Sequence, residues 1–131
     1  MVGNYLKEPL KPADDQAMMN IQIHEAGGPS NAFITLAGDL DDMGGKIARR
    51  QLARAVSSGK VNLTIDLDSV DTLNSSGLAA LIATLRLARD RGGDVRVQSS
   101  QPHIRRIMEL TGLSRVFRLT EPATAAAAPA A

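Results

Sequence analysis

The sequence predicts a single α/β domain with a mixed β-sheet and amphipathic helices, in the order β-β-α-β-α-β-α-(β). Three observations carry this prediction. The chain has 131 residues, a usual length for one domain. Apolar residues make up 44% of it and aromatic residues only 2%, so the core must be built from aliphatic side chains. Segments with a two-residue apolar period alternate with segments of helical period, which is typical of parallel strands joined by helices.

The first two predicted strands form a hairpin. Asn20–Glu25 places Ile21 and Ile23 two residues apart, and Ala32–Ala37 (AFITLA) is rich in β-prone residues. Residues 27–31 (GGPSN) lie between them and are a dense turn signal. The sheet is therefore expected to be mixed, because the later strands are separated by helices and must run parallel.

The first predicted helix spans Met43–Ser58, after a loop over residues 38–42. Asp41 or Asp42 is expected to be its N-cap, and Gly59 to end it. Its apolar residues gather on one side of the helix: Ile47, Ala48, Leu52, Ala55 and Val56.

Val61–Leu67 alternates strictly between apolar and polar residues and is the clearest strand in the chain. A loop is expected over Ser69–Asn74, followed by a helix from Ser75 or Ser76 to about Asp90. Strands covered on both faces read as continuous apolar runs, and these strands alternate instead. We therefore expect helices to cover mainly one face of the sheet, leaving the other partly polar.

The last elements are shorter. Asp94–Gln98 is a strand, and Ser100 is expected to cap a third helix that has Pro102 in its first turn. Gly112 is expected to end this helix. Val116–Leu119 then reads as a last short strand or extended segment.

Composition divides the chain into three regions. Residues 1–17 are expected to form a flexible N-terminal arm, residues 18–120 the folded domain, and the Ala/Pro-rich residues 121–131 a disordered tail. No stretch approaches the ~18 apolar residues of a membrane-spanning helix. The N-terminal residues lack the apolar region of a signal peptide. The sequence thus predicts a cytoplasmic protein without membrane insertion.

Composition also excludes several functions. The net charge of +1 and the three aromatic residues argue against nucleic-acid binding. The absence of Cys excludes disulfides, thiol catalysis and Cys-ligated zinc. His24 and His103 stand alone, and no G-x-S-x-G motif is present. Acidic residues of residues 38–42 could hold a divalent ion, but loop acids that cap helices are far commoner. No catalytic residue, metal or cofactor is therefore predicted.

The most informative segment is residues 61–78 (VNLTIDLDSVDTLNSSGL). A strand leads into a loop, and two serines stand at the start of an amphipathic helix. Asn and Ser are common helix caps, so a purely structural interpretation is open. A functional interpretation is also open, because backbone N–H groups and the helix dipole make a helix N-terminus a favourable place for phosphate.

Here the sequence resembles the STAS domain of bacterial anti-sigma factor antagonists, over about Asn20–Thr120. The matching pieces share their order and spacing with that family. They are Gly38-Asp39-Leu40-Asp41, Asn74-Ser75-Ser76-Gly77-Leu78, Gly92-Gly93 and Arg105–Leu113 (RRIMELTGL).

The resemblance implies a phosphorylation-switched binding module. Its partner would be an anti-sigma factor that is also a serine kinase of the histidine-kinase-like ATPase type, and a PP2C-type phosphatase would reverse the modification. Ser75 would be the phosphorylated residue, with Ser76 as the second choice. The partner-binding residues would be Asp41, Asn74, Ser75, Ser76, Gly77 and Leu78.

One residue departs from the family pattern. Where the family has Asp before the first serine, this chain has Asn74. The two residues cap helices about equally well, so the change is expected to affect kinase recognition rather than the fold. Two other functions are open: a STAS subunit of a larger complex, such as a stressosome-like assembly or a lipid-transport ATPase, and an enzyme or small-ligand binder that uses the aspartate loop.

Overall fold

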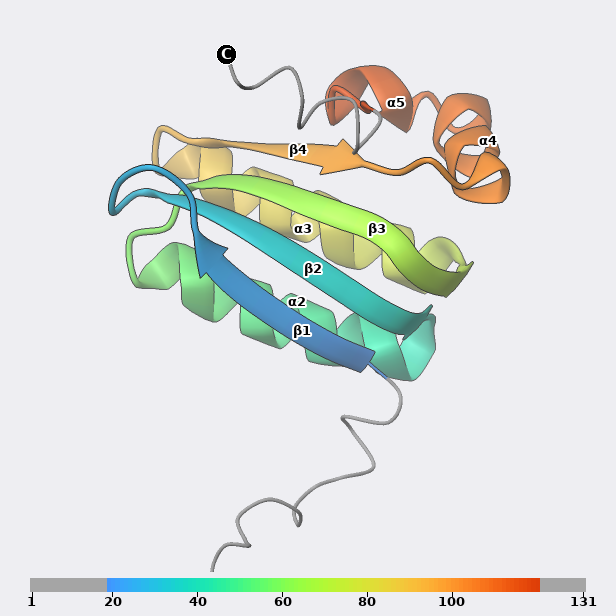
Figure 1. Cartoon of the computed structure of the whole chain (residues 1–131), viewed down its shortest axis with the longest axis horizontal. Coiled ribbons are helices and arrows are strands. Elements are labelled where there is room, and N and C mark those ends of the chain that lie inside the picture. The colour runs from blue at the N-terminus through green and yellow to red at the C-terminus, as the bar shows by residue number, and fades with distance from the viewer. Residues whose placement is uncertain (1–18, 121–131) are drawn as a thin grey trace, which may run out of the picture.

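The computed structural model describes residues 19–120, which form a four-stranded sheet and the helices packed on it (Figure 1). The strands are β1 (Met19–Glu25), β2 (Asn31–Leu40), β3 (Asn62–Leu73) and β4 (Asp94–Gln98). The helices are α2 (Asp42–Ser57), α3 (Ser75–Asp90), α4 (Pro102–Leu110) and α5 (Leu113–Val116). The predicted arm over residues 1–17 and the predicted tail over residues 121–131 lie outside the described residues.

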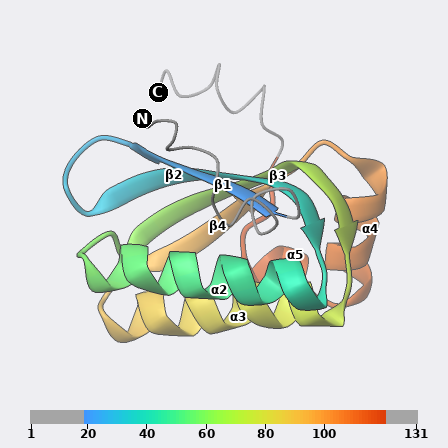
Figure 2. The same cartoon turned by 90° about the horizontal axis from the view of Figure 1, so that it is seen from below.

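The sheet is mixed, as the hairpin predicted. Its strand order is β1-β2-β3-β4, with β1 antiparallel to β2 and the other neighbouring strands parallel. Each crossover moves one strand further in the same direction across the sheet. Since such crossovers have one hand, α2 and α3 lie on the same face (Figure 2). Both helices therefore begin at the edge where β2 and β3 end.

The core fills the space between the sheet and these helices. Leu63, Ile65 and Leu67 of β3 point into it and are almost fully buried. Asn62 and Thr64, which alternate with them, lie on the other face of the sheet and keep access to solvent. The predicted division into one helix-covered face and one partly polar face is confirmed.

Two strands are longer than predicted. β3 continues to Leu73, so the predicted loop over Ser69–Asn74 is wrong, and β2 continues to Leu40 rather than ending at residue 37. Register shifts explain the error. Thr35 pairs with Asp66 and Ala37 with Ser69, so β3 holds an extra residue there, and a second shift follows near Gly38. Such bulges break the alternation by which a strand is recognised.

The C-terminal part differs from the prediction in two places. The N-cap of α4 is Gln101 rather than Ser100, and no side chain bonds the helix N-terminus. Leu113–Val116 forms α5, and the following segment is not a strand. It is instead a turn, in which Arg118 has a φ of 51°, and it returns the chain to β4: the Phe117 carbonyl accepts from Val97 N–H at 3.1 Å, and a single bridge joins Gln98 and Thr120.

Within residues 19–120, every helix is too short or too polar to cross a membrane.

Candidate functional site

The candidate site lies where β3 ends and α3 begins. Asn74 has an extended backbone and caps the helix: its side-chain oxygen accepts from the backbone N–H groups of Ser76 at 2.9 Å and Gly77 at 3.1 Å. This satisfies two of the N–H groups that a helix start leaves without partners. The capping interpretation of the sequence is therefore correct for Asn74, and the two serines occupy the first turn with the positive end of the helix dipole.

The N-terminus of α2 lies beside that of α3. Asp41 is the N-cap of α2, as one of the two predicted alternatives, and its Oδ1 accepts from Gly44 N–H at 3.0 Å. Asp42 follows in the first turn, and its carboxylate accepts a hydrogen bond of 2.5 Å from the Ser76 hydroxyl. The bond joins residues 34 positions apart, so it links the two helix starts directly.

Glycines allow the backbones to approach this closely. A Cβ atom on Gly77 would collide with the carbonyl group of Leu40 at the end of β2. A Cβ on Gly45 would lie 3.1 Å from the carbonyl oxygen of Ser76. The start of α3 is therefore fixed against both β2 and α2, and any side chain at residue 77 would displace it.

The two serines of this turn differ in their surroundings. Ser76 is half-buried and its hydroxyl is bonded to Asp42. Ser75 is exposed, and among residues 19–120 its hydroxyl makes no hydrogen bond. Ser75 is thus the hydroxyl of this turn that an incoming protein can reach.

The structure brings together most of the predicted partner-binding residues. Asn74, Ser75 and Ser76 form one exposed turn, and Asp41 lies on the adjoining α2 N-terminus. Gly77 is buried and Leu78 is half-buried against the core, so both support the turn from below. Sequence reasoning missed Asp42 as the partner of Ser76, because nothing in a sequence reports a contact between two helix starts.

Carboxylates gather around this edge of the sheet. Exposed or half-exposed aspartates lie on the β2–α2 connection and near the end of β3: Asp39, Asp41, Asp42 and Asp71. In the part of the chain that the structure describes, no three His, Asp or Glu side chains are placed to hold a metal ion. The arrangement is therefore an accessible hydroxyl on two helix N-termini, with carboxylates close by and with Lys46 and Arg49 lining the adjoining hollow.

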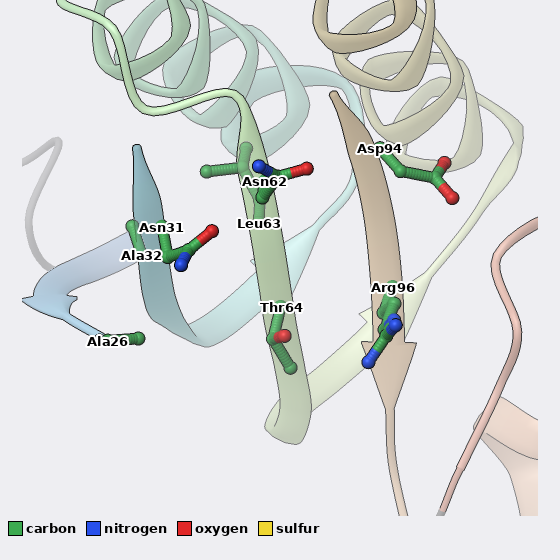
Figure 3. A pocket seen from close by; sticks show the side chains of 8 residues that line it. All are labelled: Ala26, Asn31, Ala32, Asn62, Leu63, Thr64, Asp94 and Arg96. Atoms are coloured by element: carbon green, nitrogen blue, oxygen red, sulfur yellow. The ribbon is translucent and has the colours of Figure 1, made fainter. Parts of the chain in front are cut away.

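A hollow lies at the opposite end of β3, on the face of the sheet that the helices leave open (Figure 3). Polar side chains of neighbouring strands line it, among them Asn62, Thr64 and Arg96. Asp94 stands at its rim. Burial alone would raise the pKa of Asp94, but hydrogen bonds from Val95 N–H and Arg89 and the charges of Arg89 and Arg118 outweigh it and hold that pKa below 3.8. The Asp94 carboxylate is already paired with Arg89 at 3.1 Å. We therefore do not assign a binding or catalytic role to this hollow.

Comparison with known proteins identifies the family of the chain. A family model described as "Mlab, STAS domain" matches residues 23–121. The anti-sigma-B factor antagonist of Bacillus subtilis is 22% identical over 102 residues, which are 78% of this chain and 93% of that protein.

Solved structures agree as well. The crystal structure of an anti-sigma factor antagonist from Mycobacterium paratuberculosis superposes with a TM-score of 0.72 at 26% identity, covering 86% of this chain and 92% of that one. The Bacillus cell fate determinant SpoIIAA in its phosphorylated form superposes with a TM-score of 0.63 at 17% identity, covering 85% and 99%.

The fold defines a mixed α/β domain of the kind found in anti-sigma factor antagonists. The chain belongs to the STAS-domain family, so the predicted family and fold class are confirmed.

Proposed function

We propose that this protein is an anti-sigma factor antagonist, in which phosphorylation of Ser75 ends binding to the anti-sigma factor. The names of its relatives support the class of partner. The single observation that carries the choice of residue is the contrast within the first turn of α3: Ser75 is exposed with its hydroxyl unbonded inside residues 19–120, while Ser76 is held by Asp42.

The partner would be a serine kinase of the histidine-kinase-like ATPase type. The Ser75 hydroxyl would attack the γ-phosphorus of ATP bound to that kinase. The new O–P bond forms as the bond to ADP breaks, and a base of the kinase takes the hydroxyl proton. A PP2C-type phosphatase would hydrolyse the phosphoserine. This chain contributes the acceptor and its surroundings, and the catalytic groups belong to the two enzymes.

The surroundings explain how one phosphate could control binding. Free in water, a phosphate on Ser75 would meet the positive end of the α3 dipole, so the domain should stay folded. In a complex, the phosphate would be covered by protein next to Asp41 and Asp42. It adds about 1.5 to 2 negative charges beside these two carboxylates. Burying such a charge without a partner costs several kcal/mol, enough to separate the complex.

An apolar group is also available for the partner. Met43, in the first turn of α2, is 50% exposed and lies one residue from Asp42. In a complex, this side chain would add apolar contact area beside the carboxylates of Asp41 and Asp42. We expect the unmodified form to bind through this surface.

The acceptor is tested with a purified kinase-type anti-sigma factor from the same genome and ATP. Mass spectrometry should find phosphate on Ser75 in the wild type and in Ser76→Ala, and none in Ser75→Ala. Ser75→Thr, which keeps a hydroxyl, is the matched control and should be modified. Phosphate on Ser76 or elsewhere in the wild type overturns the assignment.

The second function weighed above, a STAS subunit of a larger assembly or a lipid-transport ATPase, is less well supported. The relatives from Bacillus subtilis and Paenibacillus polymyxa are named anti-sigma factor antagonists, and the accessible serine suits that function. Stable co-purification with a transporter ATPase, with no phosphate on Ser75, would favour the alternative.

A further inference from the structure

The outer surface of the helical layer carries a groove between α2 and α3 that the switch does not use. The two helices run in the same direction and lie side by side (Figure 2). A hollow of about 450 Å³ lies between them. Its lining consists of apolar and charged side chains from both helices: Arg49, Ala53, Ala79, Ile82, Ala83, Arg86, Leu87 and Asp90.

We propose that this groove is a second contact surface for the anti-sigma factor, and that it receives an acidic amphipathic helix of that partner. The inference rests on the proposed function for the identity of the partner. The recognition chemistry comes from the groove itself: an apolar floor with an arginine on each side and one carboxylate, Asp90, among the lining residues.

The floor is apolar and reaches solvent. Leu87 is 38% exposed, and Ile82 is partly exposed although it also packs against the core. Residues 53, 79 and 83 are alanines, and their short side chains leave space between the two helices for side chains of a partner. A helix that lays an apolar face into such a groove would cover these side chains, which is a common mode of peptide recognition.

Each side of the groove carries an arginine that makes no ion pair within the described residues, and these two cations outnumber the single lining carboxylate, Asp90. Arg49 of α2 and Arg86 of α3 line the groove from its two sides, and Lys46 lies one turn from Arg49. The ion pairs in residues 19–120 are Lys60–Glu25 and Arg89–Asp94, so none involves these three cations. A partner with carboxylates flanking its apolar face would neutralise them, which favours an acidic helix over a basic one.

The groove is continuous with the switch site. A second hollow of about 390 Å³ shares Arg49 and Ala79 with the first and extends to Asp42 and Ser76. A protein that covers Ser75 therefore lies next to the open end of the groove. Sixteen residues of α3 span about 24 Å, so the combined surface is long enough for three to four turns of a docked helix.

The test is a titration of the purified anti-sigma factor with four forms of the chain, at two salt concentrations. The forms are the wild type, Arg49→Glu/Arg86→Glu, the matched control Arg50→Glu/Arg54→Glu, and the wild type phosphorylated on Ser75. The control changes the same charge at two exposed α2 positions that do not line the groove. We expect at least a tenfold loss of affinity for the groove variant, less than threefold for the control, and a loss that shrinks at high salt.

Each outcome is decisive. Equal losses for the two double variants, or no loss in either, overturn the groove. A dimer of the free chain that Arg49→Glu/Arg86→Glu abolishes assigns the groove to a second copy and overturns the proposal. If phosphate on Ser75 leaves affinity unchanged while Arg49→Glu/Arg86→Glu still lowers it, the switch fails and the groove stands. A wild-type chain that does not bind overturns both.

Discussion

Ser75-Ser76 at the start of α3 and Ser99-Ser100 before α4 are two pairs of consecutive serines that follow parallel strands of one sheet. Around Ser99-Ser100 the hydrogen-bonding groups are used internally. Asp68 Oδ1 accepts from Ser100 N–H at 2.6 Å, from the Ser100 hydroxyl at 3.0 Å and from the Ser99 hydroxyl at 3.3 Å. At α3 only Ser76 is bonded in this way, and Ser75 remains open to solvent.

This contrast distinguishes a polar cluster that stabilises the fold from a candidate binding site. β3 continues past β4, so its last residues have no strand on that side, and side chains replace the ladder. Gln101 Nε2 donates to the carbonyl groups of Asp68 and Val70 at 2.7 and 2.8 Å. Polar residues there complete the fold, because buried or partly buried backbone groups need partners. At the start of α3 the Asn74 side chain already accepts from the backbone N–H groups of Ser76 and Gly77, and the Ser75 hydroxyl makes no hydrogen bond within residues 19–120.

The largest expected effect concerns Gly77, which supports the turn that holds Ser75 and Ser76. Gly77→Ala should lower the free energy of unfolding by about 3 kcal/mol, because the new methyl group would collide with the Leu40 carbonyl and neither backbone can yield cheaply. Denaturant unfolding measures the change. Gly45→Ala is the control, since its methyl group would lie 3.1 Å from Ser76 O, and it should change stability by less than about 1 kcal/mol. Equal effects would show that the contact at Gly77 is not the constraint.

The second effect concerns Asp68, which accepts hydrogen bonds from Ser99 and Ser100. Asp68→Ala should destabilise the protein by about 2 kcal/mol, because Ser100 N–H and two hydroxyls lose their acceptor. Asp68→Asn keeps an oxygen at this position and should recover more than half of the loss. Binding to the anti-sigma factor should stay within twofold in both variants. An Asp68→Ala protein of wild-type stability would contradict the structural role given to this pair.

A smaller effect separates the two serines of α3. Ser76→Ala should cost about 1 kcal/mol, because it removes the hydrogen bond to Asp42, whereas Ser75→Ala should cost less than about 0.5 kcal/mol. Thermal unfolding of the two variants side by side checks the order. If Ser75→Ala were the more destabilising change, it would contradict the conclusion that the Ser76 hydroxyl is hydrogen-bonded and the Ser75 hydroxyl is not.

The smallest effect lies at the far end of the sheet. The pKa of Asp94 is held below 3.8 in the folded chain, so the unfolded chain binds more protons between that lowered pKa and 3.8. The stabilisation from Asp94 is present above pH 3.8 and is lost as the pH falls through the lowered pKa. Asp94→Asn should remove it, at a cost of less than about 1 kcal/mol at pH 7 because the side chain is 30% exposed. A variant whose stability falls as steeply below pH 4 as that of the wild type would contradict this.

Much of this structure could be predicted from the sequence, and the omissions have a common cause. Alternation located β3 as far as Leu67, and capping residues located the start of α3. The rest of β3 was missed because bulges remove the alternation. The Ser100 hydroxyl suits a helix cap, which is why the sequence predicts one there, but the fold directs that hydroxyl to Asp68. The bond between Ser76 and Asp42 was also missed, since it depends on how two helices pack.

The proposed switch requires that a phosphate on Ser75 prevents binding to the anti-sigma factor without unfolding the domain. The direct measurement is a calorimetric titration of the anti-sigma factor with protein fully phosphorylated on Ser75, beside unmodified protein and Ser75→Ala. We expect the phosphorylated form to bind at least tenfold more weakly, which is about 1.4 kcal/mol, with its melting midpoint within a few degrees of the unmodified form. Ser75→Ala should bind like the unmodified protein. Equal affinity of the phosphorylated and unmodified forms, with the phosphate confirmed on Ser75, would contradict the account.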